Sequence, residues 1–326
     1  MAVLQRTPDV TEQAVQTDGL LRIPITERGT LVRNVDELIR RALTRRNFLV
    51  GAGSAAALAA VGCSKTFQPA TTPLAPTTTL TDVDYLNFAL NLEYLEASYY
   101  LIAATGSGLE AADAGNGAGT VTGGAMVPFT SKIQQEYAYE IAQDELNHVR
   151  FLRSALGSAA VSAPAIDLEN SFNAAASAAG IGSSFNPFAS FDAFLVGAFV
   201  FEDVGVTAYH GAATLLTSST NLGAAAGIMA VEAYHAAEIR TLILQAGSTY
   251  VGYANQISAL RATLGGGNET SLSLTSVVAC DPTNAIAYAR TTSEVLSIVY
   301  ATSVGGATSG GFFPAGLNGN INSTTP

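Results

Sequence analysis

Apolar residues recur at helical spacing through most of the chain from Asp82 onward. In the segment DVDYLNFALNLEYLEASYY, leucines return along one side of a helix. Alternation of apolar and polar residues with a period of two, which marks strands, is nearly absent. The pattern predicts four long helices, at 82–104, 129–157, 189–217 and 220–246.

The connections between these helices predict how they pair. A Gly-rich loop at 105–127 follows the first helix, and residues 158–187, with a short helix at 169–179, separate the second from the third. Two helix pairs joined by one long crossover are typical of a single-crossover four-helix bundle. The predicted fold is therefore an all-α four-helix bundle.

The last third of the chain predicts additions to this bundle. A short helix is expected at 255–264, and Asp281-Pro282 supplies a cap and a first-turn proline for a further helix that ends near Tyr300. The Gly-rich tail SVGGATSGGFFPAGLNGNINSTTP is expected to pack irregularly.

The amino-terminal segment has the pattern of an export signal. Arg45 and Arg46 precede a short apolar run that ends in small residues, which resembles a twin-arginine signal. The run is shorter than the roughly 20 residues that a bilayer span needs. We expect an export signal at 1–63, a Thr- and Pro-rich tether at 64–81, and a folded domain at 82–326.

Cys63 leaves two outcomes open for this leader. Val61-Gly62-Cys63 resembles the end of a lipoprotein signal, so the cysteine is either lipid-modified or lost by plain cleavage nearby. The expected location is periplasmic or at the cell surface, with membrane attachment through Cys63 if it carries lipid. Cys280 is then a lone thiol and is expected to be buried and inert.

The charge distribution excludes one class of partner. The chain has a formal net charge of −11, and residues 64–326 alone carry about −13 because most of the arginines lie in the leader. Nucleic-acid binding needs a basic surface, so a nucleic-acid partner is excluded.

A Glu-x-x-His motif occurs twice in a chain with only three histidines. It comprises Glu145 and His148 in the second helix and Glu232 and His235 in the fourth. The first and third helices share a second spacing, in which a glutamate precedes a tyrosine by seven positions. These pairs are Glu93 with Tyr100 and Glu202 with Tyr209.

The spacing suits a metal centre. Residues three apart project from one face of a helix, so a carboxylate and an imidazole can reach the same ion. Two such pairs, with one glutamate from each remaining helix, provide six ligands for two divalent ions, and four carboxylates balance the charge of these ions. The predicted metal ligands are Glu93, Glu145, His148, Glu202, Glu232 and His235.

Neighbouring residues leave one alternative open. Glu96 lies one turn after Glu93 and could replace it as the ligand, although the internal repeat favours Glu93 and aligns Glu96 with Gly205. Tyr100 and Tyr209 lie on the ligand face and could hydrogen-bond a ligand. His210 is interpreted as a hydrogen-bonded helix residue.

Several segments that carry these residues resemble the ferritin-like superfamily, and specifically its exported, desiccation-related group. They are NFALNLEYLEASYY, DELNHVRF, FVFEDVGVTAYHGAA, EAYHAAEIR and GGFFPAGLNG. The resemblance covers roughly residues 82–316. It implies a ferritin-like bundle with a di-iron or di-manganese centre, held by the six residues above.

Carboxylate and imidazole ligands suit iron or manganese better than zinc. The expected function is an exported di-metal oxidoreductase that acts on oxygen, peroxide or Fe(II). The alternative is a non-catalytic stress- or desiccation-related surface protein with a structural metal site. The sequence assigns no catalytic residue beyond the ligands, and it leaves open whether the chain forms a homo-oligomer.

Overall fold

The computed structural model describes residues 79–325, and the predicted export signal, Cys63 and the tether up to residue 78 lie outside this range. The regular secondary structure of the described part is mostly helical, with one short strand pair, as predicted. No helix within it is long and apolar enough to cross a membrane. The helices are α3 (Asp82–Thr105), α4 (Ala111–Ala114), α5 (Lys132–Leu156), the 3-10 helix η1 (Gly157–Ala159), α6 (Asn170–Ala179), α7 (Phe191–Phe199), α8 (Glu202–Ala213), α9 (Ser219–Ala246), α10 (Ser248–Leu264) and α11 (Thr292–Val299).

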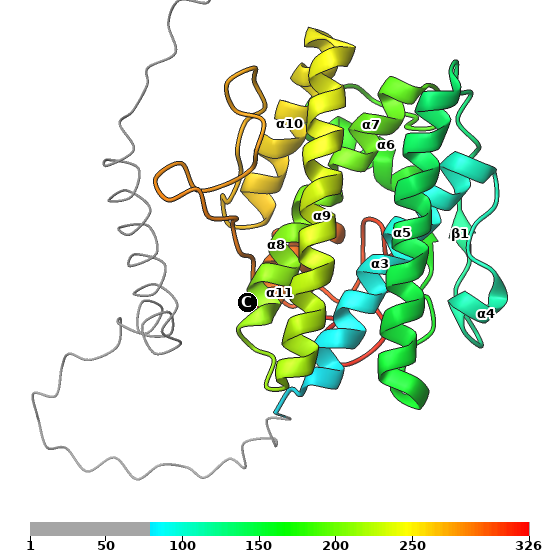
Figure 1. Ribbon diagram of the computed structural model, residues 1–326, viewed down its shortest axis with the longest axis vertical. Coiled ribbons are helices and arrows are strands. Elements are labelled where there is room, and N and C mark those ends of the chain that lie inside the picture. The colour runs from blue at the N-terminus through cyan, green and yellow to red at the C-terminus, as the bar shows by residue number, and fades with distance from the viewer. Residues whose placement is uncertain (1–78, 326) are drawn as a thin grey trace, which may run out of the picture. The chain divides into compact units, whose positions relative to one another are not determined.

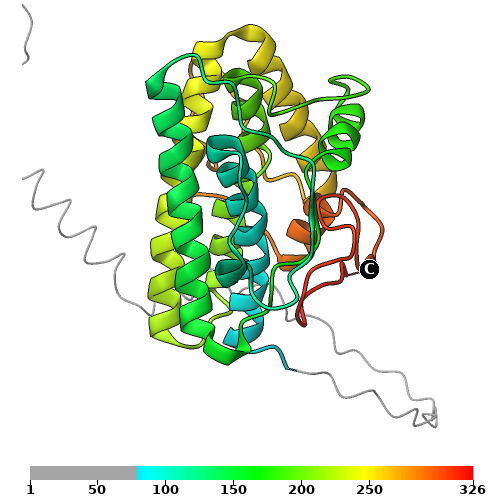
Figure 2. The same cartoon turned by 90° about the vertical axis from the view of Figure 1, so that its right-hand side faces the viewer.

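The bundle consists of α3, α5, the consecutive helices α7 and α8, and α9. Figures 1 and 2 show these helices running alongside one another. Helix α3 packs mainly on α5, and α8 packs mainly on α9. The segment from η1 to α6 forms the single long crossover between the two pairs, which confirms the predicted topology. Strands β1 (Val121–Thr122) and β2 (Ile166–Asp167) tie the first loop to this crossover as a short parallel pair.

Local sequence explains where the helices begin. The side chains of Ser131, Ser190 and Ser218 each accept a backbone N–H at the start of α5, α7 and α9. Helix α3 is buried on most sides, with 18 of its 24 residues buried. This burial explains why α3 is apolar around most of its circumference.

The predicted single helix at 189–217 is wrong, because it is broken between α7 and α8. The N–H of Val200 bonds the Gly197 carbonyl at 3.1 Å, which tightens the chain into a 3-10 turn. Arg261, from α10, donates to the Phe199 carbonyl and stacks its guanidinium 4.6 Å from the Phe199 ring centroid. The break makes Glu202 the first residue of α8.

The predicted helix from Asp281 to Tyr300 is also wrong over its first half. The Asp281 carboxylate accepts the N–H groups of Thr283 and Asn284 at 3.2 and 3.0 Å, and Ala285 adopts a left-handed conformation with φ of 55°. The chain therefore turns here, and α11 begins only at Thr292. The short helix predicted at 255–264 is present as α10, but it begins seven residues earlier, at Ser248. The tail after α11 is irregular, as predicted, and buries Phe312 and Phe313.

A chain of buried ion pairs fixes α8 against α9 and α10. The Asp203 carboxylate accepts from Arg240 and Arg261, each at 2.9 Å. Glu269 accepts from Arg261 at 2.8 Å and from Arg290 at 2.7 Å. Because these charges are largely shielded from water, losing one partner leaves the others uncompensated.

We predict that Arg261→Leu lowers the free energy of unfolding by about 3–5 kcal/mol, because buried Asp203 and Glu269 each lose one of their two arginine partners and the Phe199 carbonyl loses its donor. Arg150→Leu is the matched control: it removes another 2.9 Å arginine–aspartate pair, to Asp113, but the Arg150 side chain is 49% exposed. In urea denaturation, the control should lower the free energy of unfolding by no more than about 1 kcal/mol. Equal costs for the two variants would contradict the structural role of Arg261.

Candidate metal centre

The six predicted ligands lie together in the middle of the bundle. Helix α3 contributes Glu93 and α8 contributes Glu202, while α5 and α9 each contribute a glutamate and a histidine. Glu93, Glu145 and Glu232 are 0% exposed. The structure therefore brings all six side chains together in an interior shielded from water.

The ligand atoms form two overlapping groups, within each of which they lie no more than 4.8 Å apart. The first contains Glu93, Glu145, His148 and Glu232, and the second contains Glu145, Glu202 and His235. Glu145 belongs to both groups, so its carboxylate would contribute a ligand atom to a metal ion in either group.

Distances within the first group centre on His148. Its Nδ1 lies 3.3 Å from Glu93 Oε2, 3.2 Å from Glu145 Oε2 and 3.9 Å from Glu232 Oε1. In the second group, His235 Nδ1 lies 2.9 Å from Glu145 Oε1 and 3.5 Å from Glu202 Oε2. Two atoms that bind one ion at right angles, each about 2.1 Å from it, are about 3.0 Å apart. The observed separations therefore suit ligands of a shared ion.

Most of these atoms lack a hydrogen-bond partner. Glu232 has none at either oxygen, and Glu93 Oε2, Glu145 Oε1 and Glu202 Oε2 are also unpartnered. His235 Nδ1 and Glu145 Oε1 are close but are not aligned for a hydrogen bond. Unpaired buried carboxylates cost several kcal/mol each, so bound cations would stabilise this cluster. Four carboxylates and two imidazoles fit two divalent ions of the iron or manganese type.

Two tyrosines hold the carboxylates of the single-glutamate helices. The Tyr100 hydroxyl on α3 donates to Glu202 on α8, and the Tyr209 hydroxyl on α8 donates to Glu93 on α3. Each bond occupies one carboxylate oxygen and leaves the other directed at the cluster. The expected role of both tyrosines is confirmed, with the bonds crossing between helices.

The electrostatics of the cluster follow from burial and mutual proximity. Burial and the charge of Glu145 raise the pKa of Glu93 to about 7. Burial and neighbouring carboxylates also raise the pKa of Glu232 well above its usual value. Burial opposes charge on the histidines, but the adjacent carboxylates outweigh it and raise the pKa of His148 to about 10 and that of His235 to about 12.

Asp144 is a part of the site that the sequence did not identify. Its Oδ2 lies 3.3 Å from His235 Nε2, so it can orient the imidazole whose other nitrogen faces Glu145 and Glu202. Since Asp144 contacts the opposite helix, no local spacing marks this role.

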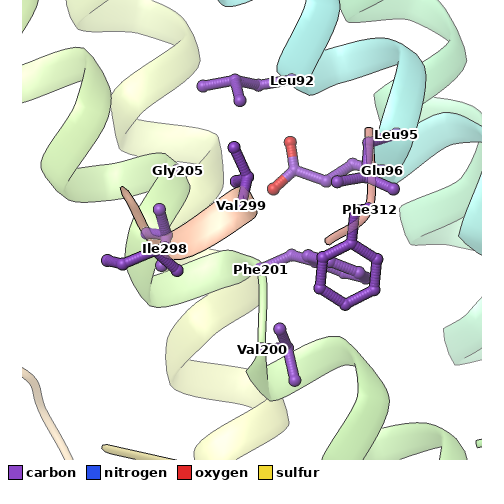
Figure 3. A pocket seen from close by; sticks show the side chains of 10 residues that line it. Leu92, Leu95, Glu96, Val200, Phe201, Gly205, Ile298, Val299 and Phe312 are labelled. Carbon is purple, nitrogen blue, oxygen red and sulfur yellow. The ribbon is translucent and has the colours of Figure 1, made fainter. Parts of the chain in front are cut away.

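Glu96 is buried but belongs to neither ligand group, so the arrangement favours Glu93 on α3. Figure 3 shows the Glu96 carboxylate directed into a small pocket of apolar side chains. His210 lies outside the cluster, with Nδ1 3.1 Å from the Tyr288 carbonyl oxygen, as interpreted from the sequence. Cys280 is a free cysteine, half-buried rather than fully buried.

Comparison with known proteins places these helices in a wider group. Residues 81–245 match the family model of the ferritin-like domain. The chain is 33% identical over 201 residues to the desiccation-related protein PCC13-62 of Craterostigma plantagineum. This alignment covers 56% of this chain and 62% of that protein. The chain is also 28% identical over 273 residues to the ferritin-like catalase Nec2 of Nesocodon mauritianus. This second alignment covers 74% of this chain and 84% of the relative.

We predict that Glu145→Gln lowers the affinity for Mn(II) or Fe(II) more than about 100-fold. The change removes the negative charge and replaces one of the two Glu145 oxygens, which face His148 and His235 respectively, by an amide nitrogen. Metal content after dialysis, measured by elemental analysis, should fall below one ion per chain. Glu136→Gln on the same helix, where the Glu136 side chain is 61% exposed, is the control and should keep the wild-type content. Full metal content in Glu145→Gln would refute the ligand assignment.

We further predict that metal binding releases protons. The histidine pKa values of about 10 and about 12 mean that both imidazoles are protonated in the apoprotein at pH 7. Metal binds only the neutral imidazole, so affinity should rise with pH between 6 and 9, about tenfold per unit for each displaced proton. Calorimetric titration with Mn(II) in buffers of different ionisation enthalpy counts these protons. A heat that is independent of the buffer would contradict the prediction.

Proposed function

Because the chain belongs to the ferritin-like domain family, we propose that it is a di-metal carboxylate enzyme, with iron or manganese, that disproportionates hydrogen peroxide. The observation that carries the proposal is the convergence of six buried donors in two groups that share Glu145. The two ions would supply the two-electron redox change that converts two peroxide molecules into dioxygen and two waters.

The residues around the ions divide the remaining work. Glu145 and the two histidines would hold the ions, and Asp144 would keep the His235 ring oriented. Tyr100 and Tyr209 would fix the outer carboxylates in one geometry. The apolar interior would keep bulk water away, which strengthens the electrostatic interactions within the site.

Two observations favour peroxide among the predicted substrates. The ligand carboxylates are at most 1% exposed, and a small uncharged molecule enters such an interior at a lower desolvation cost than a hydrated Fe(II) ion. The relative that aligns over 84% of its length is named a catalase.

We also propose that the protein acts outside the cytoplasm. The Arg45-Arg46 signal supports export, and the tether at 64–81 would separate the enzyme from its point of attachment if Cys63 carries lipid. An exported enzyme would meet peroxide from outside the cell before that peroxide enters the cytoplasm.

The test is oxygen release by the metal-loaded protein. We expect one dioxygen for every two peroxide molecules, at least about 100-fold slower with Glu145→Gln and unchanged with Glu136→Gln. An oxygen electrode with parallel peroxide assay measures both quantities. A fully loaded protein that releases no oxygen would instead support the stress-related protein with a structural site, and oxygen uptake driven by added Fe(II) would indicate ferroxidase activity.

A further inference from the structure

Beside the ligand cluster, the internal repeat pairs a glutamate with a glycine. Glu93 on α3 corresponds to Glu202 on α8, so Glu96 corresponds to Gly205. A side chain at 205 has no room, since a Cβ there would lie 2.3 Å from Glu232 Oε2 and 3.4 Å from Glu96 Oε1. Gly205 thus marks the point where the ligand Glu232 and the non-ligand Glu96 approach the same space.

A small cavity opens on this space. Glu96 and Gly205 line it, together with apolar side chains from α3, the α7–α8 break, α11 and the tail. Figure 3 shows the Glu96 carboxylate projecting among these groups, with Val299 and Phe312 close by. Glu96 is the one carboxylate among the lining residues.

The size of the cavity limits what it can hold. The volume in which the centre of a water-sized molecule can lie is about 20 Å³. Roughly 10–15 Å³ of such space holds one water, so the cavity admits a molecule of one or two heavy atoms. A hydrated metal ion or an organic substrate is too large.

From this placement we infer that the cavity is the chamber through which hydrogen peroxide reaches the metal ligands past Gly205, with Glu96 as the group that hydrogen-bonds it. The apolar wall also suits dioxygen, the uncharged product. The inference rests on the proposed function for the identity of the molecule. Its geometry rests on Glu96, Gly205 and the wall formed by Ile298, Val299 and Phe312.

Filling the chamber tests the route. Val299→Leu adds a methylene group at the wall, and we expect kcat/KM for peroxide to fall at least tenfold while two metal ions per chain are retained. Val295→Leu adds the same group to a buried position of α11 outside the cavity lining and is the matched control. Val299→Ile is a second, milder filling variant in case Val299→Leu does not fold.

A structural readout tests the chamber without activity. Crystals of the metal-loaded protein pressurised with krypton should bind a krypton atom in this cavity in the wild type and in Val295→Leu, and none in Val299→Leu. Glu96→Leu should raise KM for peroxide. Glu96→Gln keeps the capacity to hydrogen-bond peroxide, so its KM should stay near the wild-type value.

The outcomes separate the two proposals. A metal-loaded wild type without peroxide turnover would overturn the proposed function and its substrate. Wild-type turnover with undiminished kcat/KM in Val299→Leu, or no krypton in the wild-type cavity, would overturn the chamber while leaving the function intact.

Discussion

Four carboxylates gathered in the interior of a helical bundle are the constraint on which this structure depends. Glu93, Glu145, Glu202 and Glu232 have almost no contact with water, and most of their inward oxygens have no hydrogen-bond donor. Mutual repulsion alone would force such groups apart or keep them protonated. Two histidines and two tyrosine hydroxyls offset part of this repulsion, and bound divalent cations would offset the rest. Folding and metal binding should therefore be strongly coupled.

A second buried charge cluster, with an excess of positive charge, lies next to the first. In this cluster arginines alternate with acids in the order Arg240, Asp203, Arg261, Glu269 and Arg290. Asp203 directly follows the candidate ligand Glu202 in the chain. Arg261 also satisfies the Phe199 carbonyl left free where α7 ends. The same arginine thus stabilises the helix break and the orientation of the α8 start, where the helix dipole favours the Glu202 carboxylate.

The sequence was sufficient for features whose signals are local. The three-residue spacing of Glu145 and His148 is a property of one helix, and its repetition at Glu232 and His235 indicated a shared site before any tertiary contact was known. The long helices and the crossover followed from apolar periodicity for the same reason.

The features that the sequence did not reveal depend on distant contacts or on ambiguous local signals. The break before Glu202 has no proline and depends on Arg261, which lies about sixty residues further along the chain. Asp144 acquires its role only because α9 places His235 opposite it. An aspartate before Pro282 is equally suited to cap a helix or to close a turn, and the Asp281 side chain closes a turn.

The ligands and the chamber wall come from separate stretches of the chain. All six candidate ligands lie within residues 81–245, the segment that matches the ferritin-like family, whereas Ile298, Val299 and Phe312 lie beyond it. Under the proposed function, substitutions in the carboxyl-terminal segment would therefore alter which small molecules reach the metal site while leaving its candidate ligands in place. Metal binding and substrate selection would in this sense be set by separate parts of one domain.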